Sequence, residues 1–478
     1  MDFSGITFWW GLIIVGVPFI LLRYLGVKAK LYPYSLDKYA LLLISMFLFL
    51  NASSSSFYIF LIEISLNYAG VKVIISSTSR KRAVLGALVI LFDVIVLCYF
   101  KYFDFLLQNT VLSLTQHFPA VIQQYLVSPR SQSIPLGISF YTFQMIAFVA
   151  DTVKNRESGD FGLVDYVNFI SFFPKLVAGP IERGHLLLPQ IKDFRFRFSV
   201  ADIDEGLKWF ALGMFMKLVL SDNLAQLINI EEVGNSWGIW LGIFLFGFRI
   251  YFDFAGYSFM ALGLGRCLGV TLTNNFLSPY TAVNAQEFWH RWHISLTSWL
   301  KDYIYIPLGG SKTGWISLNI LIVFGVSGLW HGAGWNFIIW GIYNGLLFVG
   351  YRFLRKYVHL PNTLSWVLTF FLVMFGWIFF MDTDFHRLIL KLETMFNPFN
   401  YTMDNLLKLT NSMSLIDLAL IVCCSLMAMS ILIMEHIGDR YYNNAYKLFH
   451  LAWVGPVLLG LCLLLQSRTA SNFVYFSF

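Results

Sequence analysis

The chain has 478 residues, of which 58% are apolar and 13% are charged. Soluble domains carry charge at about a quarter of their positions, so this composition excludes an ordinary soluble protein and predicts an all-α protein that crosses a membrane many times. The formal net charge is +6, and the Lys and Arg residues lie in loops between apolar runs and form no basic patch. We therefore expect the lipid bilayer, and no nucleic acid, as a partner.

The apolar runs of the first 150 residues predict the first crossings. Residues 8–25 form one span, and the Lys- and Arg-rich loop after it places that loop in the cytoplasm and the N-terminus outside. The run 39–66 is interrupted at residues 51–56 (NASSSS) and predicts a tight hairpin of two short crossings. Residues 83–106 and 135–150 then cross outward and back.

The second part of the chain supplies the remaining predicted crossings. Residues 163–173 lie among prolines and charges and predict a short re-entrant or interfacial helix. Residues 206–220 and 237–254 predict an out-and-back pair with Asp253 at an inner helix end, and the small residues after it let backbones approach closely. Further apolar runs follow at residues 316–329, 335–350, 364–381, 415–434 and 451–465.

These runs together predict one domain that occupies residues 1–478 and crosses the membrane about 12 times. Both termini then lie outside, and residues 467–478 form an extracytoplasmic tail. The sequence has no internal repeat of fixed period, which is evidence against a symmetric transporter.

Polar side chains concentrate between residues 287 and 345. His331 stands between two long apolar runs, and because an imidazole is costly in hydrocarbon, we expect it to face protein or a water-filled cavity and to take part in chemistry. The alternative is a histidine that only fixes packing. His290 and His293 are three residues apart, so a helix brings them to similar faces. No third ligand follows at a metal-site spacing, so we expect no bound metal.

Five segments carry longer motifs, in this order: residues 173–181 (FPKLVAGPI), 251–258 (YFDFAGYS), 288–296 (FWHRWHISL), 303–310 (YIYIPLGG) and 327–333 (SGLWHGA). With these segments the chain resembles the membrane-bound O-acyltransferases, and among them the bacterial alginate O-acetyltransferase branch. The resemblance covers residues 135–350, the expected catalytic core. The flanking spans match only in length and character.

The resemblance implies helices around a central tunnel in the bacterial cytoplasmic (inner) membrane. It implies transfer of an acyl group, which we expect to be acetyl, from a cytoplasmic thioester donor such as acetyl-coenzyme A or an acyl carrier. The acceptor is a hydroxyl of an alginate-like exopolysaccharide or another cell-envelope glycan. We expect no bound cofactor, and an extracytoplasmic glycan O-acyltransferase as partner.

The resemblance also implies roles for individual residues. His331 matches the histidine regarded as catalytic, and an imidazole suits a general base because it exchanges a proton near neutral pH. His293 matches the second polar site and orients or polarises the donor carbonyl. The candidates for the donor phosphates are Arg291, Lys301 and Lys312, and the supporting residues are Trp330, Asp253, Ser295 and Asp302. Asp253 fits a purely structural role equally well.

Residues 289–302 also fit an amphipathic helix at the inner membrane interface, with Trp289, Trp292 and Trp299 in lipid and the charges in water. Three positions depart from the family pattern. Phe259 stands where Asp is usual, His290 where Arg is common, and Asn344 where His precedes Gly. These departures bear on the acceptor and on the polar network around the site.

The last residues, 472–478 (NFVYFSF), resemble a terminal aromatic motif of this bacterial branch. Composition alone favours an interfacial aromatic anchor. Our hypothesis is that the Tyr475 phenol takes the acyl group near His331 and presents it outside, because an aryl ester is a good donor for a second transferase.

Three other functions compete with glycan O-acetylation. Within the same class, the alternatives are D-alanyl transfer to teichoic acid from a carrier protein and acylation of a lipid. A different class is a transporter or flippase whose polar residues line a path, but transporters usually show repeated halves.

Overall fold

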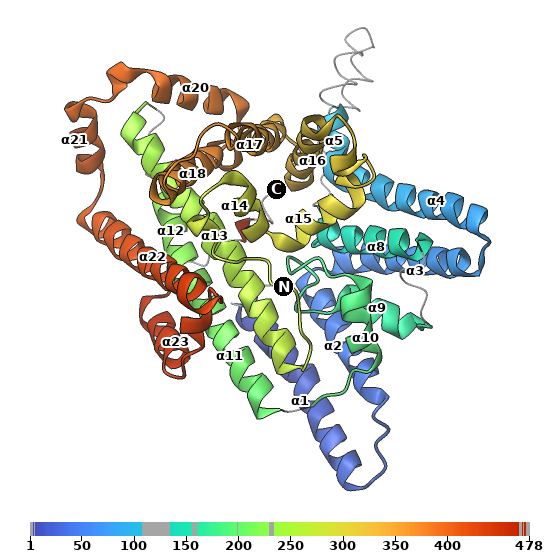
Figure 1. The fold of residues 1–478 in the computed structure, drawn as a ribbon. Coiled ribbons are helices and arrows are strands. Elements are labelled where there is room, and N and C mark those ends of the chain that lie inside the picture. The colour runs from blue at the N-terminus through green and yellow to red at the C-terminus, as the bar shows by residue number, and fades with distance from the viewer. Residues whose placement is uncertain are drawn as a thin grey trace, which may run out of the picture. The chain divides into compact units, whose positions relative to one another are not determined.

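The computed structural model describes residues 3, 5–107, 134–154, 160–197, 199–228, 234–467, 471 and 473–474. Every regular element in these ranges is helical, which confirms the predicted all-α class (Figure 1). The chain divides into two compact units, Met1–Phe198 with Leu268–Leu272, and Ser199–Cys267 with Thr273–Phe478. Each unit is treated separately below. The prediction of a single domain stays a prediction.

Unit 1 holds the first helices of the chain. They are α1 (Ile6–Lys28), α2 (Leu36–Ala52), α3 (Ser54–Ser76), α4 (Ser79–Leu97), η1 (Cys98–Tyr102), α5 (Phe103–Leu106), α8 (Ile138–Val153), α9 (Leu163–Ser171) and α10 (Gly184–Lys192).

Two sequence predictions are visible in unit 1. The run 39–66 is broken at Ser53, whose extended backbone ends α2 and whose Oγ accepts a hydrogen bond from the Ser56 amide at 3.3 Å. Serine in this position satisfies a free amide of the new helix, so the polar run starts α3. The predicted short helix is α9, with nine residues, which is too short to cross a bilayer.

Unit 2 holds the remaining helices and the motif region. The long elements are α11 (Val200–Met214), α13 (Ser236–Cys267), α16 (Ile316–His331), α17 (Trp335–Leu354), α18 (Asn362–Gly376) and α22 (Leu415–Tyr442). The shorter helices are η3 (Phe215–Ser221), α12 (Asp222–Leu227), η5 (Pro279–Thr281), α14 (Ala285–Arg291), α15 (Ile294–Leu300), η6 (Lys301–Tyr305), η7 (Gly310–Lys312), α19 (Ile378–Met381), α20 (Phe385–Phe396), η8 (Pro398–Asn400), α21 (Met403–Ser412), η9 (Lys447–His450) and α23 (Val454–Leu465).

Seven helices of the described chain are long and apolar enough to cross a membrane, and they make this a multi-pass membrane protein. They are Ile6–Lys28, Ser54–Ser76, Ser79–Leu106, Ser236–Cys267, Trp335–Leu354, Asn362–Met381 and Leu415–Tyr442. Three shorter apolar helices, α8, α16 and α23, bring the set close to the predicted number of about 12. The two further predicted crossings correspond to α2, which has only 17 residues, and to α11, which carries several charges.

Glycines hold α11 against α13, the pair that lies side by side in unit 2 (Figure 1). A Cβ added to Gly213 would lie 2.5 Å from the Gly256 carbonyl oxygen, and one added to Gly263 would lie 2.6 Å from the Gly206 carbonyl oxygen. The two helices are therefore antiparallel and in backbone contact, as expected for small residues in membrane helices. Because α13 continues to Cys267, Asp253 lies inside the helix and not at its end, which corrects the sequence prediction.

We predict that Gly213→Leu separates α11 from α13 and lowers the free energy of unfolding by about 1–3 kcal/mol or more, the usual cost of overpacking. Thermal unfolding of the purified protein in detergent measures the effect. The control is Gly325→Ala in α16, where an added Cβ meets nothing within 4 Å. Equal midpoints for the Gly213 variant and the wild type would contradict the close packing.

Candidate active site

The position of His331 is set by glycines around the end of α16. A Cβ on Gly328 would lie 2.2 Å from the Phe337 carbonyl oxygen, so α16 and α17 pack with their backbones in contact. The helix ends at His331 because the next residue, Gly332, is extended, with φ −164° and ψ 156°. A Cβ on Gly332 would collide with the Phe337 ring at 2.1 Å. The Trp-His-Gly sequence thus places an imidazole at the last position of a buried helix.

Aromatic rings surround the His331 imidazole. Its ring centroid lies 4.9 Å from that of Trp330, 5.0 Å from Trp340 and 5.2 Å from Phe380, in each case edge to face. Only 4% of His331 is exposed. These contacts fix the plane of the imidazole, because rings packed at such angles lose their rotational freedom.

His293 does not lie within a helix, in contrast to the sequence prediction that it shares a helical face with His290. α14 ends at Arg291, Trp292 is extended, and His293 adopts the left-handed conformation with φ 44° and ψ 54° before α15 begins. A non-glycine residue in this conformation costs of the order of 1–3 kcal/mol and persists only where neighbours enforce it.

Asn275 enforces this turn and was not recognised from the sequence. Its backbone carbonyl accepts a hydrogen bond from the Ile294 amide at 3.0 Å, and its side-chain Oδ1 accepts one from the Ser295 amide at 3.0 Å. Both bonds satisfy the first free amides of α15. Nothing local in the sequence links Asn275 to His293, since the two are 18 positions apart.

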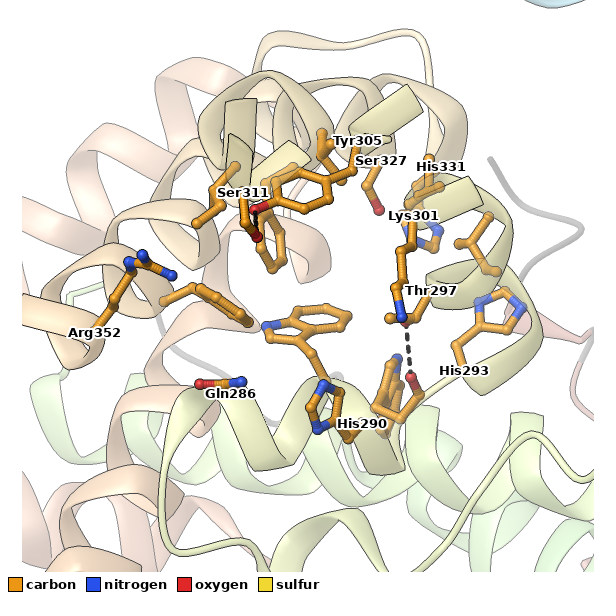
Figure 2. Close-up of a pocket in the computed structure, with 18 of the residues that line it drawn as sticks. Gln286, His290, His293, Thr297, Lys301, Tyr305, Ser311, Ser327, His331 and Arg352 are labelled. Atoms are coloured by element: carbon orange, nitrogen blue, oxygen red, sulfur yellow. Dashed lines mark hydrogen bonds between the residues drawn. The ribbon is translucent and has the colours of Figure 1, made fainter. Parts of the chain in front are cut away.

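Both histidines line one cavity of about 330 Å³ inside unit 2 (Figure 2). Its wall comes from α14, α15, η6, α16 and α17, and includes His290, Trp292, Ser327 and Phe348. The Trp330 ring contacts both imidazoles, at 5.7 Å from His293 and 4.9 Å from His331. The structure therefore brings together the two histidines that the sequence singled out, with Trp330 beside both.

The other side of the cavity is cationic. Figure 2 shows Arg352 on the side opposite His293 and His331, and Arg355 also lines the wall; Lys301 lies on the side of the two histidines. Arg352 is close to the end of α17, whereas His331 ends the antiparallel α16. Gly328 of α16 packs against Gly341 of the antiparallel α17. His331 follows Gly328 by three residues and Arg352 follows Gly341 by eleven in the opposite direction. At about 1.5 Å per residue, His331 and Arg352 therefore lie roughly 20 Å apart along the helix axes.

Of the three cations predicted to bind the donor, the structure places only Lys301 at the cavity. The Arg291 guanidinium pairs with Glu287 and Asp439, each at 2.8 Å, and so ties α14 to α22. Lys312 is exposed in η7 and is not part of the wall. Arg352 and Arg355 were missed because the sequence places them in an ordinary basic loop after an apolar span.

The predicted supporting residues separate into two groups. Trp330 contacts both imidazoles, and the Ser295 amide takes part in the turn that presents His293. Asp302 in η6 and Asp253 in α13 are not in the cavity wall. Asp253 is instead bound to Lys217, 36 positions away, with 2.8 Å between Oδ1 and Nζ.

The tryptophans of this region are buried in protein, which corrects the predicted interfacial helix. Trp292 is 1% exposed, Trp299 5% and Trp289 7%. Trp289 packs on Phe324 and Trp340, and Trp292 packs on Trp377. Their rings form the cavity wall and its support instead of contacting lipid.

Comparisons with known proteins agree with this geometry. Residues 81–383 match the membrane-bound O-acyltransferase family. A probable alginate O-acetylase of Azotobacter vinelandii is 35% identical over 361 residues, covering 73% of this chain and 68% of the relative. The chain belongs to the membrane-bound O-acyltransferase family.

Two other relatives differ in their named acceptors. The peptidoglycan O-acetyltransferase of Helicobacter pylori is 36% identical over 342 residues, which are 63% of either protein. The teichoic acid D-alanyltransferase of Bacillus subtilis is 28% identical over 275 residues, covering 53% of this chain and 70% of the relative. The chain thus spans about two thirds of the length of these relatives.

The imidazoles of His293 and His331 are titratable rings that the sequence motifs place at the cavity. Burial lowers the pKa of the His293 imidazole to about 3, so this ring is neutral at physiological pH and keeps one N–H for donation. Among the described residues, no three His, Cys, Asp or Glu side chains gather where a metal ion could bind.

The three departures from the family pattern have different structural settings. Phe259 packs in an aromatic cluster with Trp209 at 5.1 Å and Tyr446 at 4.9 Å. Asn344 donates a hydrogen bond to the Trp340 carbonyl oxygen at 2.9 Å, one turn back along α17. Only His290 lies in the cavity wall, so it is the departure that touches the site directly.

Tyr475 lies outside the described residues, so its predicted role as acyl carrier stays a prediction. Phe473 and Val474, just before it, are buried, with 6% and 3% exposed. Phe473 packs on Phe254, whose ring centroid is 4.6 Å from that of His293. Within the predicted tail 467–478, Phe473 therefore reaches the surroundings of the site in unit 2.

Proposed function

We propose that the protein is an O-acetyltransferase of the bacterial cytoplasmic membrane, which moves acetyl from a cytoplasmic thioester donor toward hydroxyls of an alginate-like exopolysaccharide or another envelope glycan. One observation carries the proposal: His331 and His293 share a cavity whose opposite side is cationic. A buried base and a distant phosphate site are what a long thioester donor requires.

In the proposed reaction, a hydroxyl oxygen attacks the thioester carbonyl carbon while His331 removes its proton. An oxygen–carbon bond forms, the carbon–sulfur bond breaks, and His331 returns the proton to the thiolate. A general base of this kind contributes about two to four orders of magnitude in rate. The aromatic rings around His331 exclude water, which would otherwise hydrolyse the thioester.

His293 polarises the carbonyl in this scheme. Its neutral ring donates its N–H toward the carbonyl oxygen, where negative charge develops during the attack. The left-handed turn held by Asn275 aims the ring, because a helical residue at this position would present its side chain along α14. His293 and His331 thus act on the same carbonyl, from the turn before α15 and from the end of α16.

The donor phosphates bind Arg352 and Arg355 in this proposal, and Lys301 lies on the histidine side of the cavity (Figure 2). Guanidinium groups match phosphate oxygens with paired hydrogen bonds. The roughly 20 Å between Arg352 and His331 fits a donor whose thioester stands at the end of a long arm. Arg291 does not fill this role, because Glu287 and Asp439 already occupy its guanidinium.

The names of the relatives favour acetyl over D-alanyl as the group that is transferred. The relatives named for O-acetylation are 35% and 36% identical to this chain, and the one named for D-alanyl transfer is 28% identical. The polymer and the partner are part of the proposal: an extracytoplasmic glycan O-acyltransferase receives the acetyl group.

Tyr475 carries the acetyl group between the two enzymes in this proposal. Its phenol oxygen attacks the thioester, its proton passes through His331 to the thiolate, and an aryl ester results. The partner then transfers the acetyl to a glycan hydroxyl and regenerates the phenol. Support comes from Phe473 and Val474, which are two positions and one position before Tyr475 and are both buried; Phe473 packs on the Phe254 ring that contacts His293.

We predict that His331→Ala lowers the rate of thiol release from labelled acetyl-coenzyme A by about two to four orders of magnitude, because the general base is lost. The assay uses purified protein in detergent. His386→Ala, an exposed histidine of α20, is the control and keeps the wild-type rate. Undiminished thiol release by the His331 variant would refute the proposed base.

We predict that the double substitution Arg352→Gln and Arg355→Gln raises KM for acetyl-coenzyme A at least about tenfold and leaves kcat nearly unchanged, since each hydrogen bond to a charged group contributes about 1.5–3 kcal/mol. Lys356→Gln, an exposed neighbour outside the wall, is the matched control. An unchanged KM would exclude these arginines as the phosphate site.

We predict that Tyr475→Phe abolishes acetylation of the C-terminal peptide and of the glycan, because the ring without its hydroxyl cannot form the ester. Mass spectrometry of the peptide after incubation with donor detects the acetyl group. Tyr441→Phe, at a tyrosine that is 72% exposed, should behave as the wild type. Normal glycan acetylation by the Tyr475 variant would remove the relay.

A further inference from the structure

Three buried charged side chains meet in unit 2 beside α13. Lys217 Nζ donates to Asp222 Oδ1 and to Asp253 Oδ1, both at 2.8 Å. At most 3% of each residue is exposed. Ser221 Oγ adds a hydrogen bond to Asp253 Oδ1 at 3.3 Å. Lys217, Asp222 and Asp253 are called the tail clamp below.

Each member of the tail clamp also binds the C-terminal segment. Lys217 Nζ donates to the Ser471 carbonyl oxygen at 3.0 Å, and the Ser471 hydroxyl donates to Asp222 Oδ1 at 2.6 Å. The Val474 amide donates to Asp253 Oδ2 at 2.7 Å. Two of these bonds involve backbone groups, so they hold the path of the chain and not a particular side chain.

The segment follows the same helices before it reaches the clamp. Asn223 Nδ2 donates to the Leu465 carbonyl oxygen at 2.9 Å, where α23 ends. The Ser467 amide donates to the Leu218 carbonyl oxygen at 3.3 Å. The chain after α23 is therefore attached to η3 and α12 before the clamp binds it.

Beyond the clamp, the segment leads toward His293. Phe473 packs on Phe254 and Tyr257, with centroid distances of 6.1 and 5.1 Å. The Phe254 ring in turn packs on His293 at 4.6 Å. A single ring, that of Phe254, therefore separates Phe473 from His293. Tyr475 follows two positions later in the sequence.

An ion pair that only joins helices does not account for this arrangement. Buried charges are expensive to desolvate, and replacing such a network by apolar residues is often neutral or stabilising. Each clamp residue nevertheless directs one bond to the same stretch of chain. Charge-assisted hydrogen bonds to backbone groups are stronger than neutral ones and set a fixed geometry.

We propose that the tail clamp fixes Ser471 and Val474, and with them Phe473 near His293, and so positions Tyr475 to accept the acyl group. This proposal rests on the function proposed above. The clamp residues are positioning residues, because they act through the C-terminal segment and do not line the cavity. Their loss frees the segment while the donor still reacts at His331.

Hydrogen exchange tests the position of the segment without any donor. Lys217→Met removes the donor of four hydrogen bonds, two of them to Ser471. We expect the peptide of residues 466–478 to take up deuterium at least about tenfold faster, because exchange follows local opening. Lys391→Met is the matched control: this lysine is 2% exposed and pairs with Asp382 at 2.7 Å. The control leaves exchange of the C-terminal peptide unchanged.

A second substitution controls for misfolding of the Lys217→Met protein. Val474→Pro removes the backbone N–H that donates a hydrogen bond to Asp253, and Val474→Ala keeps that N–H. We expect Val474→Pro and Lys217→Met to lower acetylation of the C-terminal peptide at least about tenfold, with hydrolysis of acetyl-coenzyme A by water within about twofold of wild type. Val474→Ala and Lys391→Met keep both activities.

The outcomes separate the two proposals. Loss of donor hydrolysis in His331→Ala concerns the proposed function alone, and faster exchange in Lys217→Met concerns the clamp alone. Wild-type exchange and acetylation in both Lys217→Met and Val474→Pro would overturn the clamp. So would an equal effect of Lys391→Met, or faster exchange with acetylation unchanged.

Discussion

Removing a polar side chain from water costs free energy, and this cost determines how the structure places its buried polar groups. In a membrane protein, an ionisable side chain between apolar helices must reach a cavity or a partner. His331 and His293 reach a cavity of about 330 Å³, and Lys217 reaches two carboxylates. Both the histidine cavity and the Lys217 network have a proposed function. A buried group with a high desolvation cost is retained where it reacts or where it positions a reactant.

Backbone contact between helices makes these arrangements possible. Glycines let α16 touch α17 next to His331, and let α11 touch α13 near Lys217 and Asp253. Larger residues at these positions would move the helix that carries the base or the helix that carries the clamp. Packing through small residues thus fixes the distances on which the chemistry depends.

The sequence predicted those features of the fold that depend on interactions between residues close together in the chain. The serine run at residues 51–56 marked the start of α3, and the interrupted stretch after residue 163 marked the short helix α9. The position of His331 between two long apolar runs predicted an imidazole that faces protein or a water-filled cavity, and the structure places it in a cavity wall. The all-α class and the family followed from composition and from the order of five motifs.

Long-range contacts account for what the sequence did not predict. Asn275 breaks the helix at His293 from 18 positions away, so the spacing of His290 and His293 was misleading. Arg352 and Arg355 reach the cavity only because α17 runs antiparallel to α16. The partners of Asp253 lie 36 and 221 positions away along the chain.

The most direct measurement of the central claim is an experimental structure of the protein with a non-hydrolysable acetyl-thioester analogue of coenzyme A. The account predicts the analogue inside the cavity, with its acyl carbonyl between His293 and His331 and its phosphates at Arg352 and Arg355. An analogue bound elsewhere, with apolar side chains closing around His331, would contradict it.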